Sequence, residues 1–238
     1  MGFRRVATRI ISPFGYRIIK INSDLKLEKE YYLHSYKDKL GNFDYEYYKK
    51  IQTDANKEKI ENIWVQKGNI STISDYIRSR FSTVEFGICH GTRRGLEQKW
   101  FSEFLDCSVI GTEISDTAEE FDNTVQWDFH EVKAEWINKA DFVYSNSLDH
   151  SYDPEKALNS WISCLKPGGL CILEHAYYHT AAEASEIDPF GASLHIMPFL
   201  ISLWGNGRYG VRRLLSLPES SSGHQIRAIV VERFISPD

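Results

Sequence analysis

The stretch "VEFGICHGTRRG", residues 84–95, is an apolar segment that runs directly into a glycine-bearing turn with two arginines. Residues 94–105 then show the apolar spacing of a helix. In an open parallel sheet, ligands bind beyond the carboxyl ends of the strands, so this strand–turn–helix is a candidate ligand site. The turn matches neither Gly-x-Gly-x-x-Gly nor Gly-Lys-Ser/Thr, and by itself it fits a nucleotide site, a phosphate site or a plain structural joint.

The rest of the chain alternates strand-like and helix-like segments. Strands are expected at 83–88, 108–114, 124–129, 140–146 and 168–176, and helices at 70–81, 94–105 and 154–165. This order predicts an α/β protein with a Rossmann-like, doubly wound and mostly parallel sheet. The last segment, residues 224–234, has no helix after it and is expected to be an antiparallel strand at a sheet edge.

The alternation of strands and helices begins only after residue 62, which suggests a division of the chain at that point. Residues 1–62 are expected to be a basic and then helical N-terminal extension, with helix over 25–62 and a break near Gly41. Residues 63–238 would form the Rossmann-like domain. Within it, the aromatic insert at about 177–223 predicts either a lid or pocket for a substrate, or a helix packed on the sheet edge.

Composition narrows the class of protein. The 238 residues are 26% charged and 42% hydrophobic, an ordinary globular composition. The apolar runs are far shorter than the roughly 20 residues that span a bilayer. The four cysteines form no Cys-x-x-Cys pair and no zinc spacing, so we expect reduced thiols in a cytoplasmic protein and no metal site.

Charge is distributed unevenly. Residues 1–21 carry five basic and no acidic side chains, so the net charge of −5 leaves −10 for the remainder. An acidic body argues against nucleic acid as a partner. The basic, Ile- and Phe-rich start predicts peripheral membrane contact, a strand and helix packed on the domain, or a targeting peptide.

Three side chains at expected strand ends suit a nucleoside. Glu113 lies 22 residues beyond Gly91, where an acid can accept both hydroxyls of a ribose. Asp128 can accept a hydrogen bond from the amino group of a base such as adenine, and Phe129 can pack on the ring of that base. The alternatives are an exposed strand end for Glu113, and a helix cap and a core aromatic for the other two.

A polar cluster follows the strand at 140–146. It includes Asn146, Asp149 and His150, and His150 is the candidate general base because histidine exchanges protons near neutral pH. Asp149 is expected to orient it; the alternative is that His150 only orders the loop. Glu174 and His175 end the strand at 168–176, and alternation predicts that only one of them faces the cleft.

Taken in order over roughly residues 70–176, the motifs "VEFGICHG", "VIGTEIS", "VQWDF", "ADFVYSNSLDHSYDPEKAL" and "CLKPGGLCILEH" resemble those of class I S-adenosylmethionine-dependent methyltransferases of the small-molecule, type 11-like branch. The resemblance implies S-adenosylmethionine as cofactor and a small-molecule or saccharide-type acceptor. It also implies a set of cofactor contacts. Glu85, Gly87, Cys89 and Gly91 would line the methionine part, Glu113 the ribose, Asp128 and Phe129 the adenine, and Asn146 the methyl donor.

Two other functions are compatible with this pattern. The first is a non-catalytic binding protein of the same fold, because fold alone does not settle function. The second is a nucleotide-dependent oxidoreductase, against which the incomplete glycine fingerprint counts.

Overall fold

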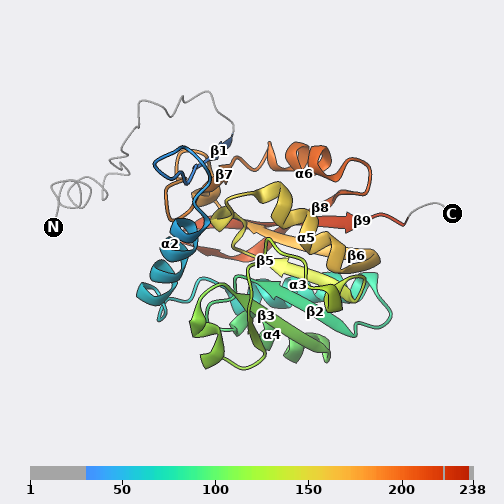
Figure 1. The fold of residues 1–238 in the computed structure, drawn as a ribbon. Helices are drawn as coiled ribbons and strands as arrows, with labels where there is room; N and C mark the ends of the chain where they lie inside the picture. Colours follow the sequence, from blue (N-terminus) through green and yellow to red (C-terminus); the bar gives the residue numbers. More distant parts are fainter. Residues whose placement is uncertain (1–30, 222, 236–238) are drawn as a thin grey trace.

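The computed structural model describes residues 31–221 and 223–235, which form an α/β fold around a seven-stranded sheet (Figure 1). The strand order is β4-β3-β2-β5-β6-β9-β8. Its strands are β2 Phe86–His90, β3 Ser108–Glu113, β4 Thr124–Gln126, β5 Ala140–Ser145, β6 Leu165–His175, β8 Tyr209–Ser221 and β9 His224–Arg233. The α-helices are α2 Tyr45–Glu58, α3 Lys67–Arg80, α4 Leu96–Leu105, α5 Pro154–Cys164 and α6 Met197–Gly205.

The predicted sheet is confirmed, with one correction at its edge. The strands β4, β3, β2, β5 and β6 are parallel, and β9 is antiparallel to both β6 and β8. The last strand is therefore interior, because β8, from the insert, pairs along its outer side. Consecutive residues Ile229, Val230 and Val231 are fully buried, as expected for a strand that is covered on both faces.

Helices cover both faces of the sheet. On one face, Trp161 and Leu158 of α5 and Ile201 of α6 pack in a core with Val143. On the other face, Ile73 of α3 and Phe101 of α4 pack in a second core. Alternate residues of each central strand pack into one core or the other, so both faces of the sheet are covered. The strand ends lie outside these cores and are available for a site.

In the described part of the N-terminal extension, the helix is α2, Tyr45–Glu58. Asp44 caps α2 by accepting the Tyr47 backbone N–H, whereas β1 (Tyr31–Leu33) pairs antiparallel with β7 (Phe190–Ala192). The expected helix is thus wrong for residues 31–44, and residues 25–30 lie outside the described part. The pairing with β7 explains the error, since a partner so distant in the chain leaves no local pattern. The division of the chain at residue 62 stays a prediction.

No helix within the described ranges is long and apolar enough to cross a membrane.

Gly87 of β2 is required by packing. A Cβ at this position would lie 2.2 Å from Cζ of Phe142, the buried residue opposite it on β5. Such overlap forces the ring or the strand to move. The small residue in this motif therefore makes room for a neighbouring side chain.

We expect Gly87→Ala to lower the free energy of unfolding by about 1–3 kcal/mol, because it overpacks the core. Urea denaturation of the two single variants and of the Gly87→Ala/Phe142→Leu pair measures the coupling. Leucine at position 142 is smaller than the phenylalanine ring and should relieve the overlap. The double variant should therefore lose less stability than the sum of the two single variants. Strict additivity would contradict the packing explanation.

Candidate active site

The sharp turn after β2 runs from Gly91 to Gly95, which adopt φ of +73° and +71°. The backbone N–H groups of Gly91 and Thr92 both donate to the carbonyl of Thr112, at 2.9 and 3.1 Å. A Cβ on Gly91 would lie 2.6 Å from Cβ of Ser147, so only glycine allows this approach. The turn thereby brings the ends of β2 and β5 together.

Three predicted contacts of this motif need correction. Glu85 precedes β2, at the far end of the strand from the turn, and its exposed side chain pairs with Lys166 at 2.9 Å. Gly87 faces Phe142, and Cys89 is fully buried in the core that contains Phe101. None of the three lines either cavity described below, because pairing with β3 and β5 extends the strand to His90.

Two cavities lie at the carboxyl ends of the strands. The large cavity, about 330 Å³, lies between the turn, the loop after β5, the end of β6 and the segment joining α2 to α3. The small cavity, about 50 Å³, lies between α2 and the ends of β3 and β4. They share five lining residues: Lys59, Gly91, Arg93, Ser147 and His150.

Glu113 lies on the wall of the small cavity, at the end of β3. It is 7% exposed, and its two carboxylate oxygens accept the backbone N–H groups of Arg93 and Ser115, each at 3.2 Å. Burial raises the pKa of this carboxyl. The exposed strand end, the alternative for this residue, is wrong.

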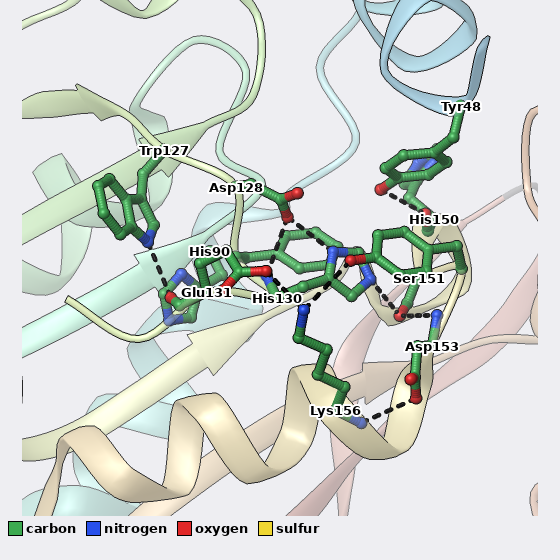
Figure 2. Close-up of polar contacts among 12 residues, drawn as sticks. Tyr48, His90, Trp127, Asp128, His130, Glu131, His150, Ser151, Asp153 and Lys156 are labelled. Carbon is green, nitrogen blue, oxygen red and sulfur yellow. Dashed lines mark hydrogen bonds and ion pairs between the residues drawn. The ribbon is translucent and has the colours of Figure 1, made fainter. Parts of the chain in front are cut away.

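Asp128 also borders the small cavity, but its carboxylate is engaged within the protein (Figure 2). Its Oδ1 contacts His130 Nδ1 at 2.7 Å, and its Oδ2 accepts the Tyr45 hydroxyl at 2.8 Å. His130 Nε2 in turn contacts Ser151 Oγ at 2.7 Å. Ser151 is fully buried, so this Asp–His–Ser chain fixes loops and anchors α2 rather than supplying a nucleophile.

Phe129 lines the small cavity beside Asp128 while packing against the core. Its ring meets Trp161 edge-on at 5.2 Å, and its carbonyl accepts the Trp161 indole N–H at 2.9 Å. These contacts fit the core-aromatic alternative and leave one part of the ring at the cavity wall.

The large cavity has two buried acids. Glu97, in the first turn of α4, is 6% exposed, and burial raises its pKa to about 8. Glu174, at the end of β6, is 7% exposed, and burial raises its pKa to about 7. Its neighbour His175 points elsewhere and contacts the Ala192 carbonyl at 2.9 Å, as alternation predicted. The sequence motifs do not single out Glu97; its one signal is an acid among the apolar positions of an amphipathic helix.

For Arg93 the sequence leaves two alternatives open, a contact with an anionic substrate or a solvated helix start. It has φ of +39°, it lines both cavities, and its Nε is buried without a hydrogen-bond partner among the described residues. Its neighbour Arg94 instead pairs with Glu61 at 2.8 Å. The two arginines of the opening stretch therefore differ, and only Arg93 offers a free buried donor.

The polar cluster after β5 lies where it was predicted, with a different pairing. Asn146 and Asp149 line the large cavity, and His150 lines both. His150 Nδ1 is 3.5 Å from Asp188 Oδ1, whereas Asp149 Oδ2 is 3.6 Å from His179 Nε2. The expectation that Asp149 orients His150 is therefore corrected: Asp188 is the carboxylate that flanks the imidazole at Nδ1.

Residues 88–173, from β2 to β6, match the family model described as a methyltransferase domain. Over this segment the chain carries a methyltransferase domain. No curated protein sequence matches it significantly.

Solved methyltransferases share the fold of this domain. The 1,6-didemethyltoxoflavin-N1-methyltransferase of Burkholderia thailandensis has a TM-score of 0.62 at 10% identity, over 82% of this chain and 92% of that one. The N-methyltransferase NodS of Bradyrhizobium japonicum has a TM-score of 0.54 at 9% identity, over 76% and 98%. The plantazolicin methyltransferase BpumL has a TM-score of 0.56 at 11% identity, over 78% and 90%.

The buried acids make stability depend on pH. A carboxyl whose pKa is raised by folding binds more protons in the native than in the unfolded state, so stability falls as pH rises through the native pKa. For Glu97 and Glu174 together, we expect the free energy of unfolding to fall by about 2–3 kcal/mol between pH 6.5 and 8.5. The buried histidines, whose pKa values are lowered by burial, change the free energy of unfolding below pH 6.5.

Urea denaturation of the wild type and of Glu97→Gln/Glu174→Gln across that pH range measures the effect. The double variant should show a flatter dependence, because glutamine does not titrate. Glu103→Gln, an acid at an outer position of the same helix α4, is the control and should follow the wild type. Parallel curves for the wild type and the double variant would contradict the expectation.

Proposed function

We propose that the protein transfers a methyl group from S-adenosylmethionine to a small-molecule acceptor in the large cavity. The observation that carries this proposal is the meeting of two cavities at Gly91 and Ser147. The small cavity has a buried acid suited to a ribose, and the large one has room for a second reactant. We place the enzyme in the cytoplasm.

The small cavity is proposed for the adenosine part of the cofactor. Glu113 would accept the ribose hydroxyls, while Asp128 and Phe129 would border the adenine. The volume of about 50 Å³ is well below that of ordinary ligand pockets, so α2 has to move outward to admit this group. Outward movement of α2 has to break side-chain contacts that include those of Gln52 Nε2 with the Ile187 carbonyl at 3.0 Å and of the Tyr48 hydroxyl with the His150 carbonyl at 3.2 Å.

The methionine part of the cofactor carries one carboxylate and one ammonium group. Arg93, with its unpartnered Nε, would bind the carboxylate, and Glu97 would bind the ammonium. Gly91 and Asn146 would border the methyl donor between them. An unpaired buried donor and a desolvated carboxyl are costly in the free protein, and a zwitterionic ligand satisfies both.

The bound cofactor supplies an electrophilic methyl group on a sulfonium. The protein then has to align the acceptor and exclude water. His150 and Asp149 are the proposed catalytic residues. His150 lines both cavities, and Asp149 lies beside it in the part of the large cavity that we assign to the acceptor and call the acceptor end. Tyr177 and Asp188, from the first part of the insert, also border this end and suit a polar, saccharide-type acceptor.

Calorimetric titration with S-adenosylhomocysteine tests the cofactor site. We expect Glu113→Gln to weaken binding by about 2–4 kcal/mol, roughly 30-fold to 1,000-fold, because a charged contact to two hydroxyls is lost. Glu119→Gln changes an exposed acid just beyond the same strand and should bind like the wild type. A wild type that is folded but does not bind would overturn the proposal and favour a non-catalytic protein of this fold.

We also propose peripheral membrane contact through residues 1–21, which carry five basic and no acidic side chains. These residues lie outside the described part of the chain, and the proposal rests on charge and composition. Deletion of residues 1–21 should reduce co-sedimentation with anionic vesicles at least tenfold, since each basic residue near such a surface contributes about 1 kcal/mol. Zwitterionic vesicles are the control, and equal sedimentation of both forms would remove the proposal.

A further inference from the structure

Three potential metal ligands converge at the acceptor end of the large cavity. Asp149, His150 and Asp188 each offer one ligand atom, and these atoms all lie within 4.8 Å of one another. Ligands on opposite sides of a divalent cation, at about 2.1–2.4 Å from it, are separated by about 4–5 Å. The three side chains are therefore already close to the spacing that one cation requires.

A second observation points to a missing ligand. The Asp149 side chain is 10% exposed, and its Oδ1 has no hydrogen-bond partner among the residues described. On the same wall, Oε1 of the buried Glu174 also lacks a described partner. A buried carboxylate oxygen without a partner costs free energy, which a positive ligand in the cavity would offset.

The charge of the cluster favours a cation over a neutral ligand. Two carboxylates face one imidazole, and His150 Nδ1 lies 3.5 Å from Asp188. Asp149 Oδ2 lies 3.6 Å from His179 Nε2, which leaves Asp149 Oδ1 for another ligand. The two carboxylates suit Mg²⁺ or Mn²⁺, and the imidazole favours Mn²⁺ of the two because Mg²⁺ prefers oxygen ligands.

We propose that Asp149, His150 and Asp188 bind one divalent cation of the Mg²⁺ or Mn²⁺ type at the acceptor end of the large cavity. Sequence analysis expected no metal, because the ligands come from two loops and share no local spacing. The cation makes His150 a metal ligand, so its part in catalysis is to hold the ion.

The chemistry of such a site narrows the acceptor class. Three protein ligands leave about three positions of an octahedral ion for other oxygens. An acceptor with two adjacent oxygen atoms, such as a vicinal diol of a saccharide, would occupy two of them and be fixed beside the methyl donor. This use of the ion rests on the proposed function, whereas binding of the ion does not.

Titration of the full-length chain with Mn²⁺ alone, followed by the electron paramagnetic resonance signal of free Mn²⁺, tests the site. We expect one saturable site per chain. Asp149→Asn and Asp188→Asn, which keep the side-chain shape, should each weaken binding at least about tenfold. Glu183→Gln alters an acid that lines the same cavity outside the cluster and should bind Mn²⁺ like the wild type.

Thermal melts of each variant and titration with S-adenosylhomocysteine separate the possible failures. Absence of saturable Mn²⁺ binding by a natively melting wild type would overturn the proposal, as would undiminished binding by both asparagine variants. Mn²⁺ binding without S-adenosylhomocysteine binding would leave the metal site standing and refute the proposed function. The reverse result would refute the metal site alone.

Discussion

The carbonyl of Gly91 accepts a hydrogen bond from Ser147 Oγ at 3.1 Å, and that of His90 accepts one from Ser145 Oγ at 3.0 Å. These contacts join the ends of β2 and β5 so closely that a side chain at position 91 would overlap Ser147. Both cavities open from this junction. A wider gap would separate the adenosine and acceptor sides, so the proposed transfer depends on this backbone approach.

Around the junction, the protein keeps several polar groups away from water. Arg93 holds an unpartnered Nε, and Glu97 and Glu174 have pKa values raised by burial. Such groups reduce the stability of the free protein and are typical of sites that bind charged ligands. The folded core on both faces of the sheet supplies the stability that offsets them.

Helix α2 connects the N-terminal extension to this chemistry. The Tyr45 hydroxyl donates to Asp128. Asp128 in turn holds His130 against Ser151 (Figure 2). The helix is thus attached to the loops that border the small cavity by phenol and amide contacts, and its buried Tyr48 packs edge-on against Tyr152. These side-chain contacts have to break when the helix moves to admit a cofactor.

Local pattern alone determined the order of strands and helices between residues 70 and 176, and the acid at the end of β3, because hydrophobic periodicity and strand ends are properties of short segments. Tertiary structure decided the rest. It extended β2 to His90 and so turned Glu85 and Cys89 away from the site. It also inserted β8 outside β9, and gave His150 the partner Asp188 in place of Asp149. Each of these outcomes depends on contacts between residues far apart in the chain, and such contacts form only when the sheet is assembled.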